Sequence, residues 1–456
     1  MVPVMSDMKP PRNTTVARAP GRCEYAMRSP VISDRVSTDA IRESSFDDRP
    51  KAAWAQGTRE TTMTTETATG KELIVRGPQA DLSGVAILQV LDALDHSGPA
   101  RSAVDLARAI RHAGGRPLIA SAGGPLLADA LVAGAEHLQM SSASSNPFTL
   151  MGTASQLSRY LAQEKVRVVH LRSRPGAWPA RRAARRRGTA TVATVSALSS
   201  AGGKLAQWLE KAVERADRVI APSAYVQQAL GEAGMSDRRI RHIPPGVDLA
   251  RFNPAGIQAA RIINLARDWQ VPDGAAVVLC PVAAAGDPGV RRLVEAMALV
   301  RAKPVVAYLL GEADGALDGL QRLVDDRGLN DRVRLYGPCR DLPAAYMLSD
   351  VVVVPNMVPP VFGQEIAEAA AMGRPVVATE LGASREMLVP GETGWLVVPD
   401  NDAALAEAID RAVSMDLGHR RAVALAARRL AQDSFSLAGM CARTLDVYAE
   451  VMADPT

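Results

Sequence analysis

Aromatic residues, cysteines and long apolar runs are all scarce in this chain. Only 4% of the 456 residues are aromatic, so we expect cores packed mainly by alanine, valine and leucine. The four cysteines, Cys23, Cys280, Cys339 and Cys441, are far apart and form no CxxC pair. This spacing argues against a disulfide framework or a zinc site and fits a reducing cytoplasm. With no run of roughly 18 apolar residues and no compact apolar core of a secretory signal, we predict neither a spanning helix nor a signal peptide.

The charge and the missing motifs exclude further classes of protein. A formal net charge of +4 is small for this length, so nothing indicates a nucleic-acid partner. The six histidines lack metal-ligand spacing, and HExxH, P-loop and GxSxG motifs are absent. We therefore predict no metal ion and no tightly bound cofactor.

One basic cluster stands out on a predicted helix. It consists of Arg181, Arg182, Arg185, Arg186 and Arg187. We favour a solvated helix end as its interpretation. The alternative is a weak peripheral contact with an anionic membrane face, which would place the protein at the inner side of the membrane, or with an anionic acceptor.

The pattern of the chain changes near residue 83. Residues 1–82 are polar and lack periodic apolar residues, which predicts disorder. An alternative is that translation begins at Met63, and a functional tail is a third interpretation. From residue 83 onward, short apolar runs alternate with amphipathic stretches. Such alternation is typical of α/β domains with a mostly parallel sheet covered on both faces.

The alternation predicts two doubly wound domains. We expect strands at Val85–Val90, Pro117–Ala120, Lys165–Leu171, Thr189–Val195, Arg218–Ile220, Ala276–Cys280, Val305–Leu310, Val333–Tyr336, Val351–Val354, Val376–Thr379 and Trp395–Val398. We expect helices at Arg101–Ala113, Leu126–Ala133, Arg291–Val300, Leu317–Arg327, Gln364–Met372, Ala403–Ala412 and Leu437–Met452. A proline-rich joint at Ile243–Pro254 separates domains 83–254 and 255–432. The two closing helices should brace both halves, with residues 433–456 returning to the first domain. Ligands of such folds bind beyond the carboxyl ends of the strands, so the cleft between the domains is the expected site.

Several ordered motifs resemble those of the retaining glycosyltransferases of family four (glycosyl transferases group 1). They are Ala216–Ser223, Ile243–Asp248, Leu329–Val333, Phe362–Thr379 and Gly391–Val397. The resemblance implies the GT-B fold, in which two Rossmann-like domains face each other across a cleft. It also implies transfer of a hexosyl unit, with retention, from a nucleotide diphosphate sugar to a cell-envelope, polysaccharide or lipid acceptor. The partners would be that donor and a sugar or lipid-linked acceptor, with no metal required.

By resemblance, the donor binds at the start of the helix Gln364–Met372. Phe362, Gly363 and Gln364 open this helix, whose free N–H groups and dipole suit phosphate oxygens. The plain alternative is an ordinary strand-to-helix turn. Glu368 matches the glutamate that accepts hydrogen bonds from the donor ribose. In the first domain, Gly98 matches part of a glycine-rich loop whose second glycine is replaced by Ser97 or Pro99.

Four positions that carry chemistry in the family are replaced here. Pro360 stands for the first of two glutamates, Ala283 for an arginine, Pro288 for a lysine, and Ser196 for a histidine. The missing cations would have made charge-assisted bonds to the diphosphate, each contributing roughly 1.5–3 kcal/mol. The resemblance therefore gives no confident catalytic residue.

Three arginines are candidates for phosphate or acceptor contacts. Arg172 and Arg174 follow a strand of valines and should line the cleft, and Arg291 is one turn into the helix after the altered loop. Three interpretations remain: an active transferase, a catalytically silent scaffold module, or an altered site in which Arg291 or Arg172 serves an unusual donor.

Overall fold

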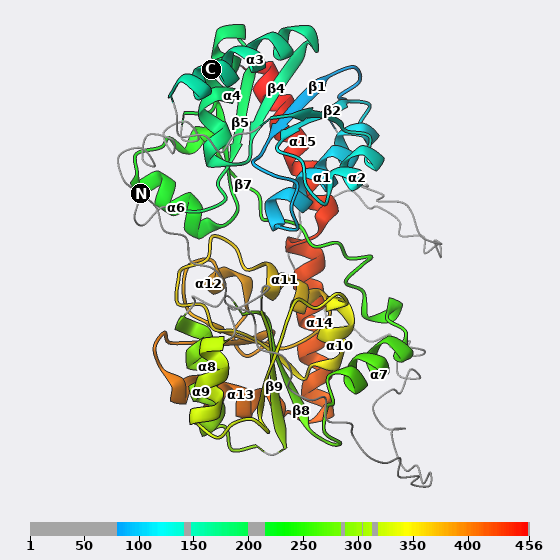
Figure 1. Ribbon diagram of the computed structural model, residues 1–456, viewed down its shortest axis with the longest axis vertical. Helices are drawn as coiled ribbons and strands as arrows, with labels where there is room; N and C mark the ends of the chain where they lie inside the picture. Colours follow the sequence, from blue (N-terminus) through cyan, green and yellow to red (C-terminus); the bar gives the residue numbers. More distant parts are fainter. Residues whose placement is uncertain are drawn as a thin grey trace, which may run out of the picture. The chain divides into compact units, whose positions relative to one another are not determined.

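The computed structural model describes residues 80–140, 147–198, 215–283, 288–302, 304–311 and 318–454. The predictions about residues 1–79 of the N-terminal extension, including Cys23 and Met63, fall outside these residues. Disorder was predicted up to residue 82, but Leu82 is fully buried in a core of the first domain, so the prediction is wrong there. The described chain forms two parallel sheets, each with helices on both faces (Figure 1).

The first sheet has seven parallel strands in the order β3-β2-β1-β4-β5-β6-β7. Their bounds are β1 (Ala86–Val90), β2 (Arg116–Ser121), β3 (Glu136–Gln139), β4 (Val166–Leu171), β5 (Ala190–Thr194), β6 (Arg218–Ala221) and β7 (Ile240–His242). Successive side chains of a strand point to opposite faces, so Leu88 and Ile87 enter different cores. Apolar residues on both faces explain why these strands read as continuous apolar runs.

Helices cover the first sheet on both sides. They are α1 (Gly98–His112), α2 (Leu127–Val132), α3 (Pro147–Gln163), α4 (Arg174–Arg187) and α6 (Ala224–Glu232). Apolar residues of α3, α4 and α6 share one core with Leu88. Leu106 and Ile110 of α1 share the opposite core with Ile87.

The second sheet has six parallel strands in the order β10-β9-β8-β11-β12-β13. Their bounds are β8 (Ala276–Ala283), β9 (Val305–Gly311), β10 (Val333–Tyr336), β11 (Val351–Val354), β12 (Val376–Thr379) and β13 (Gly394–Val397). The helices of this half are α7 (Ala259–Asp268), α8 (Pro288–Leu299), α9 (Asp318–Asp326), α10 (Leu342–Leu348), α11 (Gln364–Ala371), α12 (Ser384–Met387), α13 (Asp402–Val413) and α14 (Leu417–Ser434). One face of the sheet packs on α8, α9 and α13, and the other on α10, α11 and α14.

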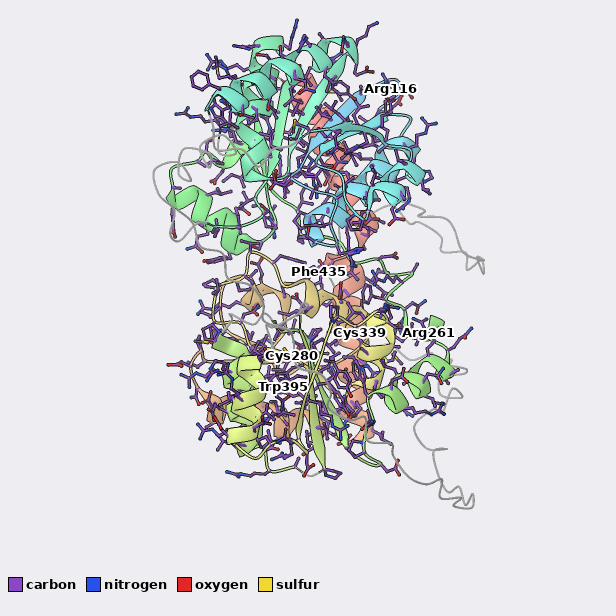
Figure 2. All side chains as sticks on the ribbon, in the orientation of Figure 1. Arg116, Arg261, Cys280, Cys339, Trp395 and Phe435 are labelled. Carbon is purple, nitrogen blue, oxygen red and sulfur yellow. The ribbon has the colours of Figure 1, made fainter. Side chains whose placement is uncertain are left out.

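The first of the two predicted closing helices differs from our expectation. We expected Ala403–Ala412 to brace both halves, but α13 packs on α8 and on strands of the second sheet, so this prediction is wrong. Instead α14 packs on α11, and α15 (Leu437–Ala453) packs on α1, β4 and β5 of the first domain. The chain thus returns to the first domain through Phe435, which ends α14 (Figure 2).

The two crossings between the halves lie side by side. The N–H of Val247 donates to the carbonyl of Phe435 at 2.7 Å, and the N–H of Leu437 donates to the carbonyl of Val247 at 3.0 Å. A Cβ at Gly246 would lie 2.3 Å from Cα of Leu437. Only glycine permits so close an approach of the two backbones.

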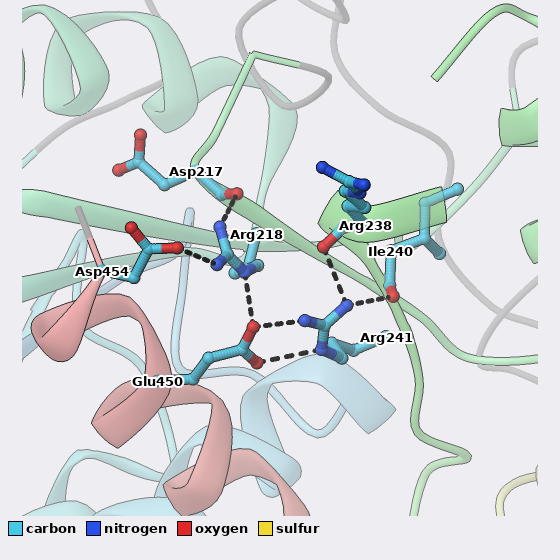
Figure 3. Close-up of polar contacts among 7 residues, drawn as sticks. All are labelled: Asp217, Arg218, Arg238, Ile240, Arg241, Glu450 and Asp454. Carbon is cyan, nitrogen blue, oxygen red and sulfur yellow. Dashed lines mark hydrogen bonds and ion pairs between the residues drawn. The ribbon is translucent and has the colours of Figure 1, made fainter. Parts of the chain in front are cut away.

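An ion-pair cluster anchors α15 to the first sheet (Figure 3). Glu450 accepts a hydrogen bond from Nε of Arg218 at 2.8 Å and another from Nε of Arg241 at 2.9 Å. Asp454 adds a longer contact to Arg218 at 3.5 Å. Two residues before Glu450 on α15, the Tyr448 hydroxyl lies 2.7 Å from Nδ1 of the fully buried His170. Burial and the charge of Arg172 hold the pKa of His170 well below its usual value, so this imidazole stays neutral.

Candidate functional site

The predicted phosphate-binding segment follows β11 and opens α11. Gly363 is the N-cap, and a Cβ there would lie 2.8 Å from Cδ1 of Ile366 and 3.1 Å from Sδ of Met387. The N–H of Gly363 donates to that sulfur at 3.0 Å. Within the described part of the chain, the N–H of Gln364 has no hydrogen-bond acceptor. The first amide of α11 that faces no protein acceptor is therefore that of Gln364, not that of Gly363.

Phe362 fixes the loop before this helix. Its half-buried ring meets the ring of Phe435 edge-on, with centroids 5.9 Å apart. The contact ties the start of α11 to the junction between α14 and α15. Phe362 therefore supports the segment through packing.

Glu368 lies one turn into α11 between two hydrogen-bond donors. The Tyr346 hydroxyl donates to Oε2 at 3.1 Å, and Nε2 of Gln364 donates to Oε1 at 3.3 Å. Burial raises the pKa of Glu368 to about 7; Glu365 adds to the rise, while Gln364, Tyr346 and Arg251 oppose it. At neutral pH this carboxyl is thus close to its midpoint of ionisation. It is an acceptor whose state a bound ligand would change.

The position of the missing first glutamate is occupied by a tightly packed Pro360. Its carbonyl accepts a hydrogen bond from the N–H of Ala383 at 3.0 Å. Gly382 has φ +51°, and a Cβ there would lie 2.6 Å from that carbonyl oxygen. The nearby Glu365 accepts a hydrogen bond from its own backbone N–H, and burial raises its pKa. Glu365 is therefore engaged locally.

The loop that should carry two cations runs between β8 and α8. Ala283 ends β8, exposed Pro288 begins α8, and residues 284–287 fall outside the described residues. Arg292 pairs with Asp402 at 3.0 Å and also with Asp400, so it is already neutralised. Arg291 is exposed, and within the described residues no carboxylate lies within ion-pair distance of it. Of the two arginines, Arg291 is the one available to an anion.

The first-domain candidates fall into different environments. Gly98 is exposed at the first position of α1, and a Cβ there would meet nothing within 4 Å. Arg172 is buried and donates to the Ser102 hydroxyl at 2.8 Å and to the Pro99 carbonyl at 3.3 Å. Burial lowers the pKa of Arg172. This guanidinium holds the first turn of α1 in place.

The two other first-domain positions are less constrained. Ser196 is exposed just beyond β5. Arg174 is the first residue of α4, and its side chain falls outside the described part. That Arg172 and Arg174 line a cleft stays a prediction.

Sequence reasoning missed two participants, Tyr346 and Met387. Tyr346 is fully buried on α10 and contacts Glu368, which is 22 residues away in sequence. A buried tyrosine reads as a core residue, and a methionine gives no signal at all. In the part of the chain that the structure describes, no group of three His, Cys, Asp or Glu residues could hold a metal ion. Among the same residues, no helix is long and apolar enough to cross a membrane.

Comparisons with known families match both halves of the chain. Residues 96–251 match the family described as Glycosyltransferase Family 4, and residues 277–415 match Glycosyl transferases group 1. The chain therefore belongs to the group 1, family 4 glycosyltransferases, and its two parallel Rossmann-like sheets are those of the GT-B fold.

Individual relatives support the same family. The D-inositol 3-phosphate glycosyltransferase of Salinispora tropica is 34% identical over 266 residues, which are 54% of this chain and 53% of the relative. The protein of the same name from Pseudarthrobacter chlorophenolicus is 34% identical over 224 residues, 46% of this chain and 52% of its own. The chain thus spans about half the length of the curated relatives it matches.

Solved structures share the fold over a longer stretch. A glycosyltransferase from Rickettsia africae matches with a TM-score of 0.76 and 26% identity, covering 82% of this chain and all (100%) of the other. HepE of Anabaena, solved with UDP and glucose, matches with a TM-score of 0.71 and 20% identity over 80% of this chain and 100% of its own.

Proposed function

We propose that this protein transfers a hexosyl unit, with retention, from a nucleotide diphosphate sugar to a cell-envelope, polysaccharide or lipid-linked acceptor. The donor would bind at the start of α11 in the second domain. The observation that carries the proposal is the geometry of α11: the Gln364 N–H, which has no acceptor among the described residues, and the Glu368 carboxyl lie one turn apart on one helix. The N–H can donate a hydrogen bond to a diphosphate oxygen, and the carboxylate can accept hydrogen bonds from the ribose diol.

Each of these groups has a defined part in the transfer. As the glycosidic bond breaks, negative charge grows on the departing nucleoside diphosphate. The Gln364 amide and the positive end of α11 would stabilise that charge. Glu368 would accept hydrogen bonds from the ribose and so fix the position of the diphosphate. HepE, of the same fold, was solved with UDP-glucose, which makes that compound the first donor to test.

The replaced positions predict weak catalysis. Ala283 and Pro288 bring no charge to the diphosphate, and Pro360 brings no acceptor to the sugar. Losing one charge-assisted bond of ~1.5–3 kcal/mol corresponds to roughly a tenfold to hundredfold loss in affinity. A donor that binds in the ground state but is poorly stabilised in the transition state is turned over slowly. Exposed Arg291 is the residue we expect to compensate in part.

The second candidate function is a catalytically silent GT-B module that acts as a scaffold. The four replacements, Ser196, Ala283, Pro288 and Pro360, favour it. It predicts that the protein binds no nucleotide sugar, although its fold is intact.

A donor screen separates the two functions. Isothermal calorimetry with UDP-, GDP- and ADP-hexoses should detect one donor, and Glu368→Ala should abolish that binding. Transfer is then measured with the donor found, using lipid-linked sugars and D-inositol 3-phosphate, for which the curated relatives are named, as acceptors. NMR of the anomeric proton in the product tests retention. If titration with each of these donors releases no binding heat, the result supports the scaffold function and contradicts the transferase function.

A further inference from the structure

Glu368 is held by two hydrogen bonds of different kinds. Oε2 accepts from Tyr346, a residue of another helix, and Oε1 accepts from Gln364, which is four residues earlier on the same helix. We infer that Tyr346 is a positioning residue for the nucleotide ribose: it fixes Glu368 through Oε2, and Gln364 holds Oε1 until a ribose hydroxyl replaces it. The inference rests on the proposed donor site and adds to it the residues that orient its carboxylate.

Tyr346 is held rigidly enough for this task. Its side chain is fully buried, and the ring of Phe252 meets its ring edge-on with centroids 6.0 Å apart. Asp341 caps the start of α10 by accepting a hydrogen bond from the N–H of Ala344 at 3.2 Å. The Arg261 guanidinium donates hydrogen bonds to both carboxylate oxygens of Asp341, at 2.8 and 2.6 Å. These contacts hold the hydroxyl in place beside Glu368.

The hydroxyl of Tyr346 is also a permanent donor. Burial raises its pKa well above the ordinary value, and the nearby Glu368 and Glu365 charges raise it further. The phenol thus keeps its proton at neutral pH, where it donates to the charged form of Glu368. Because the bond favours the ionised carboxylate, it opposes the burial that would keep Glu368 protonated.

Gln364 is suited to be displaced. Its bond to Oε1 is the longer of the two, at 3.3 Å, and its side chain is half-buried. A ribose hydroxyl donates to a carboxylate in the same way as an amide N–H does. Exchanging one donor for the other leaves the count of hydrogen bonds to Glu368 unchanged, whereas replacing Tyr346 would require a buried ring to move.

The groups that shift the ionisation of Glu368 come from three segments. Glu365 of α11 opposes its ionisation, Arg251 beyond β7 favours it, and Tyr346 of α10 favours it through the hydrogen bond. Removing the Tyr346 hydroxyl removes one of the contributions that favour the carboxylate. The Glu368 carboxyl of a Tyr346→Phe variant should therefore titrate at higher pH than that of the wild type.

The first measurement needs no ligand. Carbon-13 NMR of glutamate-labelled protein follows the Glu368 carboxyl through a pH titration, with Glu368→Gln identifying its resonance. Tyr346→Phe should move the midpoint upward. Tyr308→Phe is the matched control, because Tyr308 is also fully buried in the second domain and donates to the Trp269 carbonyl at 3.2 Å. An unchanged midpoint in Tyr346→Phe, or an equal shift in both variants, overturns the inference.

The second measurement compares UDP, ADP and GDP with their 2′,3′-dideoxy analogues by calorimetry. Wild-type protein should prefer the ribose form, and Tyr346→Phe should weaken it roughly tenfold while leaving the dideoxy form unchanged. The Gln364→Ala variant should bind the ribose form at least as tightly as wild type. Equal wild-type affinity for both sugars overturns the role of Tyr346 but supports a nucleotide site. Failure of all six nucleotides to bind overturns the proposed function and this inference with it.

Discussion

Removing the charge of Glu450 should loosen α15 from the first domain. The change Glu450→Gln keeps the volume of the side chain but leaves Arg218, whose side chain is 6% exposed, with only the longer 3.5 Å contact to Asp454. Breaking a buried pair costs ~3–5 kcal/mol, and because the Glu450 side chain is 33% exposed we expect about 2–3 kcal/mol here. At ~2–4 °C per kcal/mol for domains of this size, the melting temperature should fall by about 4–12 °C.

The matched control is Glu407→Gln on α13. Glu407 pairs with Arg411 at 3.0 Å, but its side chain is 73% exposed, so its loss should cost less than about 1 kcal/mol. Calorimetric scans of wild type and both variants at pH 7 provide the comparison. Equal melting temperatures for wild type and Glu450→Gln would refute the idea that this cluster anchors α15.

The effect of Glu450→Gln should also depend on pH. Burial alone would raise the pKa of Glu450, but the hydrogen bonds and charges of Arg241 and Arg218 outweigh it and lower the pKa. A lowered pKa in the folded state stabilises the protein above the unfolded pKa of roughly 4.3, and that stabilisation is lost as the pH falls further. The difference from wild type should therefore be full at pH 7 and shrink below about pH 4. A difference that stays constant down to pH 3 would exclude the ionic origin.

Three further predictions concern the donor site. Replacing Ala283→Arg together with Pro288→Lys should tighten nucleotide-sugar binding by roughly 1.5–3 kcal/mol per restored cation, which for two cations is about a hundredfold or more, measured by calorimetry. Unchanged affinity would mean that the diphosphate does not lie at this loop. Since the pKa of Glu368 is raised to about 7, donor affinity should rise from pH 5.5 to 8 as the carboxylate forms, and Glu368→Gln should remove that dependence; a wild-type affinity independent of pH would contradict it. Gly363→Ala should lower the free energy of unfolding by about 1–2 kcal/mol because the new methyl meets Ile366 and Met387. Gly98→Ala should leave the free energy of unfolding unchanged and weaken only donor binding. Donor affinity equal to that of wild type in Gly98→Ala would show that Gly98 is not part of the site.

Most of the sheet was predictable because its strands are buried on both faces. Val333–Tyr336, Val351–Val354 and Val376–Thr379 form strands at the predicted residues. Their runs of β-branched and apolar residues have no helical period, so a strand was favoured over a helix for each of them. The sequence did not reveal α14, because its buried positions are mainly alanines, such as Ala427 and Ala431, while Leu417 and Leu425 are exposed. The difference in hydrophobicity between the buried and the exposed face of α14 is therefore small.

The candidate site was predictable only as a segment of chain. The resemblance pointed to Phe362–Gln364 and Glu368, which the structure brings to the first turns of one helix. It did not reveal that the Gly363 N–H faces a sulfur or that Tyr346 contacts Glu368. Both contacts join residues on different elements, and their geometry depends on how α10, α11 and α12 pack. No local pattern encodes such a distance.

The return of α15 has a consequence for how the protein is made. Leu437, Met440, Cys441, Leu445 and Tyr448 complete the core that contains Ile87, Ile110 and Val168. These residues are synthesised after the whole second domain, so the part of this face that α1 does not cover stays exposed on the ribosome until α15 has been translated. During that time it is an apolar surface available to chaperones and to aggregation. The first domain therefore matures last, although its strands are translated first, and a fragment ending at the joint would lack part of its own core.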